Sequence, residues 1–140
     1  MIDDFSFGVI LKKEGSMPAR FLLVKQKKHW SFPKGHSEGS EDIETTIRRE
    51  LFEETGISSI SLDLEKKVTE DSYVFERNGE FYKKTNNYFF ASTSESVLKI
   101  QEGEIYDARF ATLDEISDLF VHPTQKSLLE KIKKILNEEK

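Results

Sequence analysis

The chain has no cysteine among its 140 residues, and no apolar run in it approaches the length of a membrane span. The first absence excludes disulfide bonds, thiolate zinc sites and cysteine nucleophiles, and it favours an intracellular location. The second argues against a transmembrane helix. The opening residues, Met1 to Phe5, are acidic where a secretion signal would be basic. We therefore expect a soluble, cytoplasmic protein with no membrane partner.

An excess of positive charge is also lacking, because the formal net charge is −5 at pH 7. A stable complex with nucleic acid through a broad basic field is therefore not expected. The sign of the charge changes sharply along the chain. No acid occurs from Gly15 to Ser37, and acids then follow at Glu38, Glu41, Asp42, Glu44, Glu50, Glu53 and Glu54. This order suits a polyphosphate with divalent cations, and two solvated faces of opposite sign are the alternative interpretation.

Segments rich in aromatic and branched residues predict strands at residues 5–12, 21–27, 72–77, 80–93 and 104–111. The third and fourth of these are joined by Asn78-Gly79, which is typical of a tight β-hairpin. Residues 29–39 contain Pro33, Gly35 and Gly39 and are expected to form a loop.

Three helices complete the pattern. The first is expected to begin after an N-cap at Ser40 and to stop at Gly56. Thr112 followed by Glu115 is a capping-box sequence for a short second helix, and apolar residues at helical spacing over 128–136 predict an amphipathic third. Together the elements predict an α/β fold in which one domain, residues 1–140, has a mixed sheet between helices.

The first helix carries acids on the side that should be buried. At about 100° per residue, Glu50 and Glu54 project in the direction of Ile43 and Ile47. Close, partly buried carboxylates must take up protons or bind cations. Oxygen ligands select hard ions, so we expect Mg²⁺, with Mn²⁺ possible, rather than zinc. The alternative is a helix end whose acids simply reach water.

The same segment matches a known motif position by position. It contains, at the required spacing, Gly35, Glu41, Arg49, Glu50, Leu51, Glu53, Glu54, Gly56 and Ile57. This pattern resembles the Nudix box, here residues 35–57. The resemblance implies the Nudix fold, an α/β/α sandwich, and an enzyme in which water attacks a diphosphate linkage with the help of magnesium.

The resemblance also implies roles for individual residues. Glu50, Glu53 and Glu54 would bind the metal ions, joined by the backbone carbonyl of Lys34. Glu50 is our choice for the general base, and Arg49 would orient a helix glutamate; with Glu54 these form the predicted catalytic group.

An acid from a later loop often completes such a site. Glu104 resembles it most, with Glu102 as the alternative.

The loop before the box bears on the substrate. Trp30 followed by Pro33-Lys34-Gly35-His36 resembles the asymmetric dinucleoside tetraphosphate hydrolases, which split diadenosine tetraphosphate into ATP and AMP. RNA pyrophosphohydrolases share Trp-x-x-Pro but usually have Gln-Gly-Gly in place of Lys-Gly-His. A small nucleotide is the expected partner, RNA 5′ ends or modified nucleoside triphosphates are alternative substrates, and a nucleotide sensor is the non-enzymatic alternative. A monomer is favoured, although the sequence does not determine the oligomeric state.

The substrate-binding residues expected from this resemblance are Trp30, Lys34, His36, Tyr82, Lys84 and Tyr88. Lysine and histidine would hold phosphates, and tyrosine would contact phosphate or stack on a base. Each has a structural alternative, since Trp30 could cap the core and the tyrosines could face it. Asp71 is interpreted as a solvating charge, and His122-Pro123 as a turn that leads into the last helix.

Overall fold

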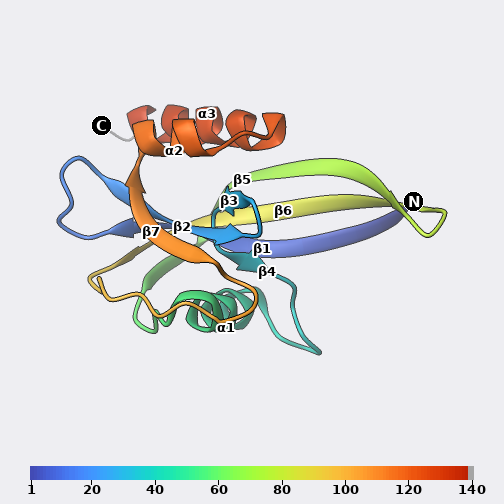
Figure 1. Ribbon diagram of the computed structural model, residues 1–140, viewed down its shortest axis with the longest axis horizontal. Helices are drawn as coiled ribbons and strands as arrows, with labels where there is room; N and C mark the ends of the chain where they lie inside the picture. The colour runs from blue at the N-terminus through green and yellow to red at the C-terminus, as the bar shows by residue number, and fades with distance from the viewer. Residues whose placement is uncertain (139–140) are drawn as a thin grey trace.

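The computed structural model describes residues 1–138 and has a central mixed sheet between helices (Figure 1). Its strands are β1 Ile2–Lys13, β2 Arg20–Gln26, β3 His29–Ser31, β4 Lys34–Gly35, β5 Ser61–Arg77, β6 Glu80–Thr93 and β7 Asp107–Thr112. Its helices are α1 Ile43–Thr55, α2 Leu113–Leu119 and α3 Pro123–Glu138. Helix α1 covers one face of the sheet, and α2 and α3 cover the other. This confirms the expected α/β fold.

The sheet runs in the order β3-β2-β1-β6-β5, with β4 added to β1 and β7 to β2. The parallel pairing of β1 with β6 extends from Ile2 opposite Tyr82 to Lys13 opposite Thr93. It joins the start of the chain to its middle. None of the helices in residues 1–138 has the length and apolar character needed to cross a bilayer.

The hairpin predicted at Asn78-Gly79 is confirmed, since β5 and β6 pair through it and both turn residues have positive φ. Strand β5 begins at Ser61, well before the expected residue 72. Its early part carries mostly exposed charged side chains, which have low strand propensity. As an edge strand it has one paired side, which tolerates such residues. The sequence pattern therefore missed it.

Helix α1 begins two residues later than expected. Its N-cap is Asp42, whose carboxylate accepts a hydrogen bond from the backbone N–H of Thr45 at 2.8 Å, so the prediction of Ser40 was wrong. The expected ending is confirmed, because Gly56 closes the helix with φ +78°. At α2 the capping box of Thr112 and Glu115 is confirmed as well.

Two apolar clusters lie on opposite faces of the sheet, because successive residues of a strand point to opposite sides. Ile10 of β1 packs with α2 and α3, whereas its neighbours Val9 and Leu11 pack with Ile47 and Leu51 of α1. These contacts fix α1 against the sheet and determine where its acids lie.

Candidate active site

Two glycines allow β1, β4 and α1 to meet closely. Strand β4 pairs with β1, with Lys34 opposite Gly8 and Gly35 opposite Phe7. A Cβ atom at position 8 would lie 2.7 Å from the Pro33 carbonyl oxygen, and one at position 35 would overlap the carboxyl group of Glu50. A glycine is therefore required at position 35, because the Glu50 side chain lies against the backbone there.

The acids of α1 lie where its helical periodicity places them. Glu54 is only 4% exposed, and its Oε2 has no hydrogen-bond partner within residues 1–138. Burial, reinforced by the nearby charge of Glu50, raises the pKa of Glu54 to about 8. Burial also raises the pKa of Glu50. Ile43, expected on the buried side, is 37% exposed because it occupies the first helical position.

Arg49 connects these acids to the loop before the helix. Its guanidinium donates hydrogen bonds to Glu41 at 2.7 Å, to Glu50 at 2.9 Å and to Glu53 at 3.1 Å. It also donates to the backbone carbonyl of His36 at 2.9 Å. The hydrogen bonds from Arg49 lower the pKa of Glu41 to about 2. Arg49 thus contacts two helix glutamates, Glu50 and Glu53, and its role in orienting them stays a prediction.

The expected magnesium fits the acids of this region. Within residues 1–138 no three acidic or histidine side chains already converge as a ligand sphere. Instead, Glu50 and Glu53 turn toward Arg49, and Glu54 keeps a buried oxygen without a partner. A buried carboxylate oxygen that lacks a hydrogen-bond partner and lies near a second acid is a suitable ligand for a hard divalent cation.

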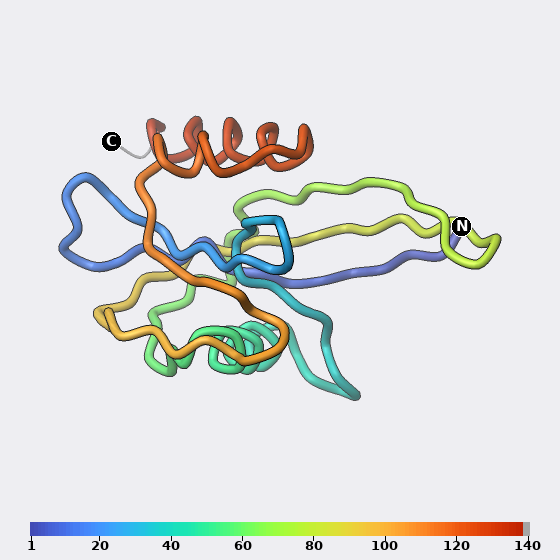
Figure 2. Tube along the Cα trace, in the orientation of Figure 1, coloured from blue at the N-terminus to red at the C-terminus, as the bar shows by residue number. Residues whose placement is uncertain are grey.

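The segment between β6 and β7 runs along the end of α1 (Figure 2). The backbone N–H of Lys99 donates to the carbonyl of Thr55 at 2.8 Å, and that of Gln101 to the carbonyl of Glu54 at 3.3 Å. Glu104 follows in a turn, because β7 begins only at Asp107 and not at the expected residue 104. Its charge acts on Glu54 and raises the pKa of that carboxyl.

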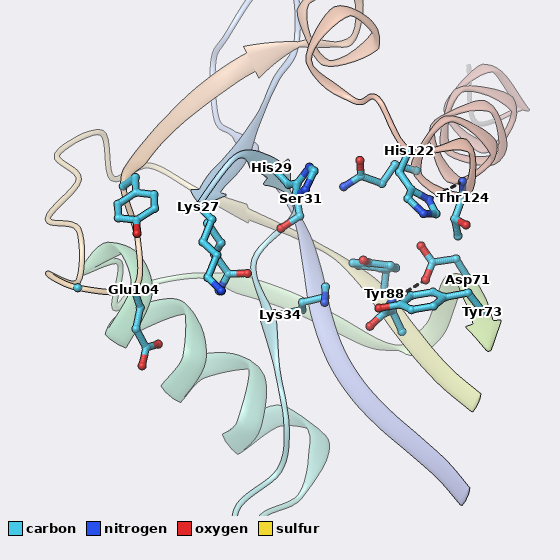
Figure 3. A pocket seen from close by; sticks show the side chains of 15 residues that line it. Lys27, His29, Ser31, Lys34, Asp71, Tyr73, Tyr88, Glu104, His122 and Thr124 are labelled. Atoms are coloured by element: carbon cyan, nitrogen blue, oxygen red, sulfur yellow. Dashed lines mark hydrogen bonds between the residues drawn. The ribbon is translucent and has the colours of Figure 1, made fainter. Parts of the chain in front are cut away.

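A cavity of about 630 Å³ opens beside Glu104, and none of the α1 acids is among its lining residues (Figure 3). Three residues predicted from the sequence line it, namely Lys34, Tyr88 and Glu104. Glu102, the alternative to Glu104, is not among the lining residues. In Figure 3 the Lys34 side chain points into the cavity between Glu104 on one side and Asp71 on the other. Burial and the charge of Lys84 lower the pKa of Lys34.

Two of the expected phosphate-binding residues form a separate group that does not line this cavity. The Lys84 Nζ lies 2.8 Å from the His36 Nε2 and 3.4 Å from a carboxylate oxygen of Asp4. His36 lies 2.7 Å from the other oxygen of Asp4. Hydrogen bonding to His36 and the charges of both partners hold the pKa of Asp4 below its usual value, against the opposing effect of burial.

Two of the expected aromatic residues also lie outside the cavity lining. Trp30 packs against the apolar cluster beneath α2 and α3, and the Lys25 ammonium lies 5.9 Å from the centre of its ring. Tyr82 stacks on Phe75 with ring centres 5.2 Å apart. Tyr88 lines the cavity and is also 3% exposed, with its ring edge against Phe32.

The sequence pattern did not identify much of the cavity wall. The cavity lining also includes Lys27, His29, Asp71, Tyr73, Asn86, Tyr106, His122 and Gln125. The interpretation of Asp71 as a solvating charge was wrong, since this half-buried carboxylate accepts a hydrogen bond from the Asn86 amide at 2.7 Å.

His122 leads into α3 as expected, and its Nδ1 accepts the backbone N–H of Thr124 at 3.2 Å. It also lines the cavity. The one available signal for this wall was the shared parity of Asn86 and Tyr88 on β6.

A model of the NUDIX domain matches residues 4–132. The chain belongs to the Nudix domain family. The motif at residues 35–57, which includes the acids of α1 and Arg49, lies within the matched region. The class of reaction that goes with this membership is the hydrolysis of nucleoside polyphosphates.

Individual relatives extend over most of this Nudix protein. An RNA pyrophosphohydrolase of Pelagibacter ubique is 28% identical over 142 aligned residues, which cover 92% of this chain and 90% of the relative. A crystal structure of a C. elegans Ap4A hydrolase binary complex superposes with a TM-score of 0.76 at 20% identity, covering 96% and 98% of the two chains. The NUDIX domain of Shewanella oneidensis NrtR, in a complex with ADP ribose, gives 0.72 at 17% identity, with 97% and 90% covered.

Proposed function

We propose that this Nudix protein cleaves a phosphoanhydride bond of a nucleoside polyphosphate, and that its preferred reaction is the asymmetric cleavage of diadenosine tetraphosphate into ATP and AMP. The observation that carries the proposal is the position of Lys34. Its ammonium points into a cavity whose two ends are an acidic wall at Glu104 and an aromatic wall at Tyr73 and His122. A phosphate chain fits the first part, and a nucleoside fits the second.

The Nudix acids would hold the divalent cation. The residues in question are Glu50, Glu53, Glu54 and Glu104, with the backbone carbonyl of Lys34. When bound, magnesium would neutralise phosphate charge and make the attacking water more acidic. The unpartnered oxygen of Glu54 supports this assignment, because a cation would supply the interaction that the folded chain leaves unmet.

The chain's own residues then divide the remaining work. Glu50 accepts the proton as the water oxygen attacks phosphorus and the bond to the leaving phosphate oxygen breaks. Arg49 keeps Glu50 and Glu53 in place through its hydrogen bonds. The Lys34 ammonium stabilises the negative charge that develops on the phosphate oxygens.

The remaining proposed substrate contacts differ in whether they line the cavity together with Lys34. Tyr88 forms part of the cavity floor next to it. His36, which follows β4, and Lys84 of β6 meet at Asp4 of β1, and they would take up the distal phosphates after parting from Asp4. Trp30 and Tyr82, which do not line the cavity, complete the proposed binding residues.

A second candidate is an RNA 5′-pyrophosphohydrolase. It is favoured by the Pelagibacter ubique relative, which resembles this chain over nearly its whole length. The Pro33-Lys34-Gly35-His36 loop favours the dinucleotide, since Lys34 adds a cation and His36 a polar ring nitrogen suited to a bridged phosphate chain.

Product analysis separates the two candidates. The protein is incubated with magnesium and either diadenosine tetraphosphate or 5′-triphosphorylated RNA, and products are identified by chromatography. We expect equal amounts of ATP and AMP from the dinucleotide, with a larger kcat/KM than for RNA. Release of pyrophosphate from RNA without cleavage of the dinucleotide would overturn the preference.

A further inference from the structure

The cavity has an acid at each end, and the two have different surroundings. Glu104 stands on the side of α1, whose acids are proposed to hold a cation. Asp71 stands on the opposite side, on β5, among Tyr73, Asn86 and His122. A bare carboxylate at that end repels phosphate, so the part of a ligand that it contacts must be of another kind.

Asp71 is held by a buried chain of hydrogen bonds. The Ser6 hydroxyl donates to Asn86 Oδ1 at 2.5 Å, and this orients the amide so that its Nδ2 donates to Asp71 Oδ1 at 2.7 Å. Ser6 is 1% exposed and Asn86 is 4% exposed. These hydrogen bonds link β1 through β6 to β5 and hold the Asp71 carboxylate in place. They engage one of the two carboxylate oxygens.

The second carboxylate oxygen remains an acceptor beside a wall of flat rings. Within residues 1–138, Asp71 receives one side-chain hydrogen bond, the one from Asn86. Beside it, the rings of Tyr73 and His122 have their centres 6.3 Å apart. Flat rings favour a nucleobase, and a fixed acceptor next to them requires a donor on the same ligand.

We propose that Asp71 is a specificity residue that accepts a hydrogen bond from an N–H or O–H group of the substrate's nucleoside. The donor is the amino group of the base or a hydroxyl of the ribose. This inference rests on the proposed function, and it fixes the direction of the substrate, with phosphates toward Lys34 and Glu104 and the nucleoside toward Asp71.

The test compares a ligand that has a nucleoside with one that lacks it. Calorimetry measures the binding of AMP and of inorganic pyrophosphate to the wild type, to Asp71→Asn and to Glu70→Gln. Asp71→Asn should bind AMP at least about 10-fold more weakly, the effect of a lost hydrogen bond to a charged group. Its affinity for pyrophosphate should stay within about twofold. Glu70→Gln, a change in the neighbouring exposed acid, should alter neither.

Ligand analogues identify the donor in the wild-type protein and need no variant. AMP is compared with the monophosphate of purine riboside, which lacks the 6-amino group, and with 2′,3′-dideoxy-AMP, which lacks the hydroxyls. At least one should bind about 10-fold more weakly than AMP. Equal binding of all three would overturn the inference, as would an equal loss of AMP and pyrophosphate affinity in Asp71→Asn.

The two proposals fail separately in these experiments. Binding of AMP needs no turnover, so a protein that leaves diadenosine tetraphosphate intact can still reveal the role of Asp71. Conversely, normal cleavage together with unchanged AMP binding in Asp71→Asn would reject the specificity role and leave the hydrolase proposal standing.

Discussion

The two ends of the cavity are built in different ways. The acidic end combines Glu104, from the turn before β7, with acids outside the cavity lining that come from one short stretch, β4 and α1, in which Arg49 collects Glu41, Glu50 and Glu53. The aromatic end draws on β5, β6 and the start of α3, and its carboxylate is fixed from a strand at the other end of the sequence. Most of the groups proposed for the chemistry are therefore encoded locally, with Glu104 as the exception, whereas groups proposed for recognition depend on the topology of the sheet.

The largest expected effect is at the acidic end. Glu54→Gln should reduce kcat by about 10²-fold to 10⁴-fold, because it removes a proposed cation ligand while preserving shape. Thermal unfolding should show an intact fold. Magnesium should raise the melting temperature of the wild type by mass action, and it should do so less in the variant.

Glu44→Gln is the matched control for this change. Glu44 lies on the exposed side of the same helix and pairs with Arg48 at 3.6 Å. Its replacement should leave activity unchanged. A Glu54→Gln protein as active as the wild type would show that the metal site lies elsewhere.

The next largest effect is expected at Lys34, which we compare with Lys84 because the sequence predicts phosphate binding for both. Lys34→Met should lower kcat/KM by about 10²-fold, as the loss of one charge-stabilising donor does. Lys84→Met should cost less than about 10-fold in kcat/KM, because its ammonium is already paired with Asp4 and its place is beyond the cavity lining. Steady-state kinetics with diadenosine tetraphosphate provide the measurement, and a larger loss at Lys84 would reverse this order.

A substitution at Arg49 tests whether its positive charge alone, or also the geometry of its guanidinium, is needed to hold the glutamates in place. Arg49→Lys keeps the charge but loses the planar fork that reaches Glu41, Glu50 and Glu53 together. We expect a fall in kcat of about 10-fold to 100-fold, which is typical for groups that orient metal ligands. Arg48→Lys, at the half-buried neighbouring arginine that pairs with Glu44, is the control. Equal activities of both variants would show that positive charge suffices.

The local part of this architecture could be predicted from the sequence. Periodicity placed Glu50 and Glu54 on the inner side of α1, and Gly56, Asn78-Gly79 and the Thr112 capping box mark their elements correctly. Each of these signals depends on residues within a turn or two of one another. That is why they can be recognised without knowledge of the fold.

The remaining features depend on contacts that no local pattern contains. Asp71 looks like a surface acid in the sequence because the residues that hold it are distant in sequence. Its hydrogen bonds run through Asn86 to Ser6, and Ser6 lies 80 positions from Asn86. His122 looks like a simple turn residue in the sequence because the ring that it contacts, that of Tyr73, belongs to the distant strand β5. The exchange of Ser40 for Asp42 as N-cap has a smaller cause, since both residues have side chains suited to that position.

The smallest expected effect lies far from both ends, at the start of α2. Thr112→Ala removes the acceptor for the Glu115 backbone N–H at 3.2 Å and should destabilise the fold by about 1 kcal/mol. Activity should not change, because neither residue lines the cavity. Urea unfolding at neutral pH measures the loss, and a fall in kcat/KM would show that α2 is coupled to the active site.

Lowering the pH should remove the stability that Glu115 contributes through the same capping box. Hydrogen bonds from the backbone and side chain of Thr112 hold the pKa of Glu115 below its ordinary value of 4.5. A depressed pKa in the folded state means that the carboxylate stabilises the fold above pH 4.5 and that this stabilisation disappears as the pH falls through the folded value. Urea midpoints of the wild type and Glu115→Gln should therefore differ at neutral pH and converge in acid. A gap that persists in acid would mean that the glutamate acts through packing and not through its charge.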